Sequence, residues 1–308
     1  MPVPPRTSAR LLLVLAAVLW STGSLFTRLL QEPTILNLHE PALSSMQIAF
    51  YRALFAGLCL LPLVRRRSCR FRPLMGVMVA TFAVMNALYI AALGYGSAAN
   101  AILLQNTAPL WVYLVGVYLI GEVADRRAFH AILIGFLGAV VIVAGNWPRG
   151  TDARGPEQVE VLLMGVGSGI TYAGVVLLLR ALRAESAAWL TMLNLLGTAA
   201  MIAVSMAVLH GRDGFCGWVS APTARQLVFL MLFGAVQLAA PYVLFASSLK
   251  TVNPNEASII TLLEPVLNPI WAYLIAPDRE TPTVWTFIGG LLLLAALAWR
   301  YAPRRAVL

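Results

Sequence analysis

Ten apolar segments, each about 20 residues long, follow one another along this chain and constrain its fold more than any other feature. A helix rises about 1.5 Å per residue, so about 20 residues cross a hydrocarbon layer of about 30 Å. The segments are 11–30, 44–64, 73–95, 98–120, 128–147, 159–179, 187–209, 226–249, 255–275 and 284–301. The pattern predicts an all-α, polytopic membrane protein with ten transmembrane helices.

Composition supports a membrane location for this apolar surface. Of the 308 residues, 60% are hydrophobic and 11% are charged, whereas soluble domains carry about 25% charged residues. The net charge of +9 comes from arginines in short segments between the apolar runs. That placement is typical of topology signals and of contact with anionic lipid headgroups. We therefore expect membrane lipid as a partner and no nucleic acid.

The distribution of arginine and lysine predicts the orientation. With the N-terminus inside, 15 of the 22 basic residues fall on the cytoplasmic side, while six, including Arg28, fall on the outer side. Arg52 lies within a span. The excess predicts that both termini are cytoplasmic, in a multi-pass protein of the bacterial cytoplasmic (inner) membrane.

A segment rich in helix breakers, from Pro148 to Glu157, divides the spans into two groups of five. We therefore expect two five-helix repeats, residues 1–149 and residues 150–308. Because five is odd, the second repeat would enter the membrane from the opposite side, which makes the copies inverted. A shift of 156 residues aligns Pro109 with Pro265, a weak trace of duplication.

Short motifs occur in a fixed order through both halves. They are Leu19-Trp20-Ser21-Thr22, Phe50-Tyr51-Arg52-Ala53, the segment from Ala98 to Gly145 with its Gly121-Glu122 turn, Leu263-Glu264-Pro265-Val266 and Ile288-Gly289-Gly290. In this order and spacing, the chain resembles the EamA-type branch of the drug/metabolite transporter (DMT) superfamily and is similar to bacterial amino-acid and metabolite exporters. The segment from Ala276 to Glu280 departs from the family, which usually repeats a Gly-Glu turn there.

Polar groups and prolines at membrane depth mark a candidate substrate site, because lipid offers polar groups no hydrogen-bond partner. The candidate substrate-binding residues are Trp20, Asn86, Tyr89, Gln105, Asn106, Trp111, Thr171, Tyr172, Gln237, Tyr242, Glu264 and Asn268. The candidate helix breaks or gating points are Pro109, Pro241, Pro265 and Pro269. Each proline leaves a backbone carbonyl one turn earlier without its helical hydrogen bond. The free carbonyl can bind substrate and the weakened helix can bend during gating, or the proline produces only a static kink. Amides and aromatic rings together suit a small zwitterion with an apolar or aromatic side chain.

Two charged residues lie within the predicted spans. Glu264 either lines a hydrated cavity, where it binds a substrate ammonium or carries a coupling proton, or it is a helix-packing acid beside Pro265. For Arg52 a structural role is favoured, through snorkelling or a salt bridge to an acid, because long cationic side chains reach the interface easily.

The resemblance implies a secondary active transporter that exports small metabolites by alternating access around a midplane cavity, with neutral or aromatic amino acids as the leading class. The alternative is a sugar-phosphate or nucleotide-sugar exchanger of the same superfamily. Binding such anions would require several Lys or Arg side chains in the cavity, and Arg52 is the only candidate within the predicted spans, so neutral or zwitterionic cargo is favoured. An intramembrane enzyme is disfavoured, since no HExxH, GxSxG or paired-acid motif occurs at a common depth. We expect no catalytic residue, no metal, no cofactor, a small-molecule substrate, and a monomer or weak dimer.

Overall fold

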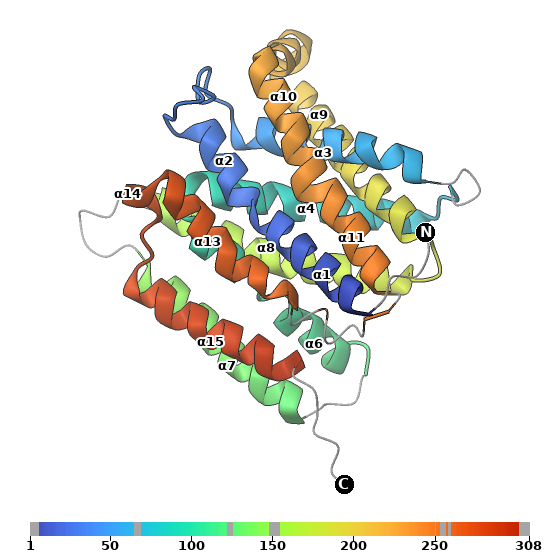
Figure 1. Cartoon of the computed structure of the whole chain (residues 1–308), viewed down its shortest axis with the longest axis vertical. Coiled ribbons are helices and arrows are strands. Elements are labelled where there is room, and N and C mark those ends of the chain that lie inside the picture. Colours follow the sequence, from blue (N-terminus) through green and yellow to red (C-terminus); the bar gives the residue numbers. More distant parts are fainter. Residues whose placement is uncertain are drawn as a thin grey trace.

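The computed structural model describes residues 6–64, 69–121, 126–147, 155–249, 251–252, 257 and 260–301. Within these ranges the regular elements are all helical, which confirms the predicted all-α class. The helices of the first half are α1 (Arg6–Ser21), α2 (Gly23–Gln31), α3 (Ser45–Leu60), η1 (Leu61–Leu63), α4 (Pro73–Tyr95), α5 (Ala98–Gln105), α6 (Ala108–Tyr118) and α7 (Arg126–Gly145). Those of the second half are α8 (Gly155–Ala181), α9 (Ala187–Ser220), α10 (Ala224–Phe233), η3 (Gly234–Ala239), α11 (Ala240–Ser248), α13 (Leu263–Ile275), α14 (Pro277–Glu280) and α15 (Val284–Tyr301) (Figure 1).

Eight apolar helical stretches in the described ranges are long enough to cross a membrane. They are Thr7–Gln31, Ser45–Leu63, Pro73–Tyr95, Ala98–Tyr118, Arg126–Gly145, Val159–Ala181, Ala187–Ser220 and Ala224–Ser248. Their positions agree with the first eight predicted spans. Helices α13 and α15 cover parts of the last two predicted spans, and the predicted ninth span begins outside the described residues. Most of the predicted linker and Glu122 of the Gly-Glu turn also lie outside them. The number of ten spans therefore stays a prediction.

The first predicted span is divided into two helices. Thr22 separates α1 from α2, and its hydroxyl donates a 2.6 Å hydrogen bond back to the Leu19 carbonyl. At the start of α2, a Cβ atom on Gly23 would lie 3.3 Å from the side-chain nitrogen of Gln237. The break and the small residue after it let the first span approach η3 closely.

The seventh span is longer than the predicted range of 187–209. Helix α9 continues to Ser220 through a kink at Gly211, whose positive φ of 69° favours glycine. The side chains of Gln47 and Tyr51 on α3 donate hydrogen bonds of 2.8 and 2.5 Å to backbone carbonyls in the last turn of α9. These contacts to a distant helix hold a segment that the apolar pattern left as a loop.

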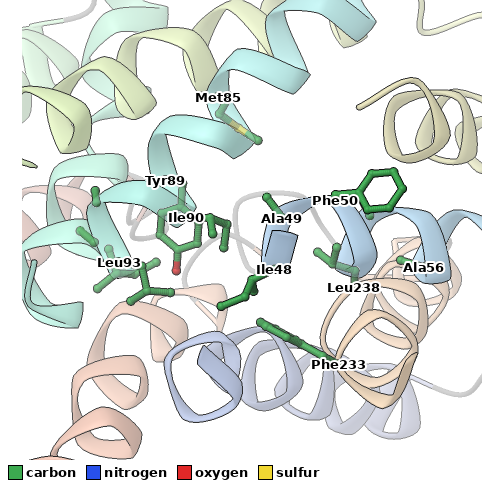
Figure 2. Close-up of a cluster of buried hydrophobic side chains, with 14 of the residues drawn as sticks. Ile48, Ala49, Phe50, Ala56, Met85, Tyr89, Ile90, Leu93, Phe233 and Leu238 are labelled. Atoms are coloured by element: carbon green, nitrogen blue, oxygen red, sulfur yellow. The ribbon is translucent and has the colours of Figure 1, made fainter. Parts of the chain in front are cut away.

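Helices from the two halves pack side by side. Helix α7 lies along α15 and α3 along α9, while α4 packs on α8 and α1 on α11 (Figure 1). Buried apolar side chains from both halves form one main core. Figure 2 shows part of it, where Ile48 of α3, Ile90 and Leu93 of α4, Phe233 of α10 and Leu238 of η3 converge. The two halves therefore share a core.

The outer surface of the helices is rich in large apolar side chains. Leu133 and Leu137 on α7, Val204 on α9 and Leu291 on α15 are more exposed than buried. Apolar surface of this extent is unfavourable in water and suits contact with lipid tails. The fold thus supports the inference from composition that the surplus apolar surface faces the membrane.

Candidate functional site

Three of the four candidate prolines lie at irregular backbone. Helix α5 ends at Gln105, Asn106 and Thr107 form a turn, and α6 begins at Ala108 with Pro109 in its first turn. The π-helical turn η3 comes directly before α11, which has Pro241 in its first turn. Helix α13 begins at Leu263, so Pro265 also lies in a first turn, whereas Pro269 lies inside α13 without ending it.

Pro241 explains the π-helical turn that precedes it. Proline has no N–H to donate to the carbonyl four residues earlier, which is that of Gln237. The chain widens into η3, a kind of turn that occurs frequently at functional sites. The buried side chain of Gln237 then links two other helices. Its amide oxygen accepts a 3.3 Å hydrogen bond from Arg52 on α3, and its nitrogen donates a 3.0 Å bond to the Trp20 carbonyl at the end of α1.

The guanidinium of Arg52 lies inside the helical bundle. Only 2% of the residue is exposed, so the expected snorkelling to the interface is wrong. The guanidinium donates hydrogen bonds to the side-chain oxygens of Asn86 and Gln237, and it sits over the ring of Phe233 at 5.4 Å. No described acid lies within ion-pair distance of it. Neutral amides on two neighbouring helices take the place of the expected acid.

Asn268 connects a second set of helices to the same region. Its side-chain nitrogen, fully buried on α13, donates a 3.4 Å hydrogen bond to the hydroxyl of Tyr89 on α4. Its backbone carbonyl accepts a 2.5 Å bond from the hydroxyl of Ser24 on α2. Figure 2 shows the Tyr89 ring projecting from α4 into the core.

Helix positions connect Arg52 and Glu264 to the same region. Asn86 and Tyr89 lie about one turn apart on α4, and Glu264 and Asn268 lie about one turn apart on α13. The hydrogen bonds from Arg52 to Asn86 and from Asn268 to Tyr89 join these two turns. Glu264 is half-buried and has no hydrogen bond or ion pair with another described residue. Tyr242 also meets the Trp20 ring edge-on at 5.4 Å. We call these residues the central polar cluster, and its members are Trp20, Arg52, Asn86, Tyr89, Gln237, Tyr242, Glu264 and Asn268.

The other candidate substrate-binding residues are Gln105, Asn106, Trp111, Thr171 and Tyr172, and the side chains of Asn106, Trp111 and Thr171 form local hydrogen bonds. The Asn106 side chain donates a 2.8 Å bond to the Ile102 carbonyl of its own helix, and the Thr171 hydroxyl does the same to Gly167 at 2.7 Å. Tyr172 is 40% exposed. Some of the polar side chains predicted at membrane depth are therefore satisfied by carbonyls of their own helices rather than by a substrate site.

Trp111 lines a separate cavity of about 500 Å³ between α6, α7 and α8. Its indole nitrogen donates a 3.1 Å bond to the Thr107 hydroxyl, and its ring meets Phe136 edge-on at 4.9 Å. The remaining walls are mostly alanine and valine side chains. This cavity offers few polar groups to a charged substrate, unlike the central polar cluster.

A buried ion pair that the sequence analysis missed ties the two halves together at one end of the bundle. Arg28 of α2 donates a 2.5 Å hydrogen bond from Nε to Glu280 of α14, and neither side chain is exposed. Arg28 also donates a 2.6 Å bond to the Gly96 carbonyl, and Glu280 accepts a 2.8 Å bond from the Ala98 amide. Beside it, Arg279 donates a 2.6 Å bond to a carbonyl of the same α4–α5 turn.

The sequence contained a signal for this pair. Arg28 stands near the end of the first apolar run, and Glu280 lies in the segment where a Gly-Glu turn is usual in the family that the chain resembles. The glutamate is thus present although the glycine is not. The contact between Arg28 and Glu280, which are 252 residues apart, could not be predicted from the sequence.

Comparison with known proteins decides the family. The sequence profile of the EamA-like transporter family matches residues 7–144 and matches again over residues 159–301. The chain belongs to the EamA-like transporter family. It is a multi-pass membrane transporter of the drug/metabolite transporter superfamily, which implies a small-molecule substrate and a lipid environment.

Similar proteins carry transporter names. The EamA-like chain is 31% identical to an uncharacterized transporter of Archaeoglobus fulgidus over 94% of its own length and 95% of the relative's. It is 25% identical to the pseudopaline exporter CntI of Pseudomonas aeruginosa over 92% and 93% of the two chains. A solved crystal structure of another protein superimposes with a TM-score of 0.61, covering 96% of this chain and 98% of that one at 17% identity, which shows likeness of fold alone.

Proposed function

We propose that this EamA-like protein is a secondary active transporter that exports small metabolites by alternating access, with amino acids as the leading class of cargo. The observation that carries the proposal is the central polar cluster. Its members come from both halves, namely α1, α3 and α4 on one side and η3, α11 and α13 on the other. Buried polar groups in an apolar bundle mark substrate or ion pathways in membrane proteins, and broken helices line such sites.

The packing of the helices supports two inverted repeats. If residues 1–149 and 150–308 exchange places, the contact of α4 with α8 becomes the contact of α11 with α1. The α3–α9 and α7–α15 pairs each map onto themselves. A pseudo-two-fold axis produces this pattern, and five spans in each half would place that axis in the membrane plane. The family profile also matches once in each half. We therefore propose ten spans with both termini in the cytoplasm, in the inner membrane.

In that orientation, Arg28 and Glu280 close the outer end of the pathway. The pair joins α2 to α14, and the carbonyls and amide of the α4–α5 turn complete its hydrogen bonds. Release of cargo to the outside requires these segments to separate. The described conformation therefore corresponds to a state that is shut on its outer side.

The charges of the cluster favour a zwitterion over a phosphorylated sugar. Arg52 is the cation among its members, and Glu264 is the acid. A phosphate with two negative charges would meet one cation and be repelled by the acid. Similarity to the pseudopaline exporter CntI supports the export direction and makes pseudopaline a second candidate cargo.

Reconstituted transport tests the proposal. The purified protein is placed in liposomes, and uptake in counterflow is measured with labelled pools of amino acids, sugar phosphates and nucleotide sugars. We expect saturable flux with at least one amino acid and none in protein-free liposomes. Saturable flux limited to the phosphorylated pools would exclude the amino-acid class, and no saturable flux with any pool would oppose the transport proposal itself.

A further inference from the structure

We propose that Arg52 binds the carboxylate of the transported molecule and that Glu264 binds its ammonium group, so that together they select zwitterions. This inference rests on the proposed function and adds to it the role of Arg52 and the orientation of the cargo. A structural role for Arg52 was the expectation from the sequence.

The first observation is that Arg52 is a buried cation without a described anionic partner. Its hydrogen bonds go to the amide oxygens of Asn86 and Gln237, and it also contacts the ring of Phe233. These groups solvate the guanidinium but do not cancel its charge. A buried charge is stable in a membrane when an opposite charge accompanies it, and an anionic ligand would supply one.

The second observation is that unpaired donors gather around Arg52. The Nε atom of Arg52 and the side-chain nitrogen of Asn86 are both buried and have no hydrogen-bond partner. Two N–H groups on adjacent side chains match the two oxygens of a carboxylate, and hydrogen bonds to an ionised oxygen are stronger than those to a neutral one. The unpaired atoms at this end of the cluster are thus donors.

The third observation is that unpaired acceptors gather at the other end. The side-chain oxygen of Asn268 is buried without a partner, and Glu264 has no hydrogen bond or ion pair with a described residue. A carboxylate and an amide oxygen are the acceptors that an ammonium group with three donors requires. Glu264 and Asn268 lie on α13 one turn apart, so both side chains face the same way.

Tyr89 and Tyr242 connect the two ends. The Tyr89 hydroxyl accepts the hydrogen bond from Asn268, and Tyr89 lies on α4 about one turn after Asn86, which accepts a bond from Arg52. The Tyr242 ring contacts Trp20, whose carbonyl accepts a bond from Gln237. Donors at one end, acceptors at the other and aromatic rings between them complement a molecule with a carboxylate, an ammonium group and an apolar body.

Competition binding tests the two charge assignments separately. Full-length protein in detergent micelles is titrated with L-phenylalanine, with phenylalanine amide, which lacks the carboxylate, and with 3-phenylpropionate, which lacks the ammonium. We expect the amino acid to bind about tenfold or more tightly than either analogue, because each analogue loses one charge-assisted contact. Equal binding of the amino acid and both analogues would overturn the proposal.

The variants assign each charge to its residue. Arg52→Gln should weaken phenylalanine by about tenfold or more while leaving phenylalanine amide unchanged. Glu264→Gln should weaken phenylalanine while leaving 3-phenylpropionate unchanged. Arg225→Gln, which removes an exposed arginine of α10, is the control and should change none of the three affinities. Parallel losses for amino acid and amide in Arg52→Gln would show a merely structural role and would overturn the proposal.

A second substitution covers the case in which Arg52→Gln does not fold. Asn86→Asp keeps Arg52 and places a carboxylate beside its guanidinium, where it would compete with the carboxylate of the cargo. We expect weaker phenylalanine binding with unchanged amide binding, and unchanged phenylalanine binding in a folded variant would overturn the assignment. If no standard amino acid binds but another cargo shows saturable flux, the proposed zwitterion site is wrong and the proposed transport function is retained. If no cargo shows saturable flux, the proposed function is contradicted as well.

Discussion

Arg28 and Glu280 form a fully buried ion pair although 252 residues separate them in the chain. The pair joins the end of the first span to the connection between the last two helices. Burying two charges carries a desolvation cost that Coulomb attraction offsets only when the remaining donors and acceptors are also satisfied. The Gly96 carbonyl and the Ala98 amide meet that condition here.

Breaking this pair should destabilise the protein. Glu280→Gln leaves Arg28 buried without its counter-ion, and we expect a loss of about 3–5 kcal/mol in the free energy of unfolding, measured by thermal or denaturant unfolding in micelles. Glu32→Gln removes the partner of Arg279 in a more exposed pair and serves as the control, with an expected loss below about 1 kcal/mol. Equal losses in the two variants would contradict the special role of the buried pair.

The same pair should control access from the outside. Thr27 is fully buried next to Arg28, so a cysteine there reports on the outer closure once the exposed Cys59, Cys69 and Cys216 are replaced by serine. We expect slow labelling of Thr27→Cys by a membrane-impermeant thiol reagent added outside, and faster labelling when Glu280→Gln is also present. Labelling at one rate in both backgrounds would mean that the pair does not hold this end shut.

Local sequence pattern predicted the elements and their order. Apolar runs located the first eight spans, because span length is a property of neighbouring residues. The break at Thr22 and the continuation of α9 past Gly211 were missed. Both lie at contacts with distant helices, namely η3 and α3.

The candidate site was predictable in its residue types but not in its pairings. Polar residues at membrane depth gave Glu264, Asn268 and Gln237, since lipid cannot satisfy them. The sequence favoured a structural role for Arg52, because the length of its side chain alone indicates that it can reach the interface. Its burial could not be predicted in this way, since it depends on contact with Asn86 of another helix. Residue type indicates which groups need partners, and the fold decides which partners they meet.

Glu264→Gln should remove the dependence of transport on pH. Glu264 is the acid among the members of this cluster, whose other titratable side chains are Tyr89, Tyr242 and Arg52, and it lies about one turn from Asn268, which is hydrogen-bonded to Tyr89. If it alternately binds a proton and the cargo ammonium, a pH gradient drives export in the parent and has no effect on the residual flux of the variant. The measurement is liposome flux at saturating cargo with and without the gradient, and Glu160→Gln, an exposed acid of α8, is the control. Unchanged pH dependence in Glu264→Gln would assign the residue to packing.

Gly234→Ala should separate η3 from α3. A Cβ atom on Gly234 would lie 2.7 Å from the Arg52 carbonyl oxygen and 2.8 Å from the Ala56 nitrogen. We expect destabilisation by about 1–3 kcal/mol from overpacking, with reduced flux because Gln237 moves away from Arg52. Gly217→Ala, where a Cβ meets nothing within 4 Å, should leave both quantities near those of the parent. A Gly234→Ala variant with parental stability would contradict the close contact.

Opposite threading of the two halves is the claim on which the transport cycle depends, and tag accessibility tests it most directly. One epitope tag is placed at the N-terminus and another between residues 150 and 154, and each is probed with a membrane-impermeant reagent in intact cells and in permeabilised cells. Five spans in the first half predict that the N-terminal tag is protected in intact cells and that the internal tag is exposed. Both tags on the same side of the membrane would contradict inverted halves.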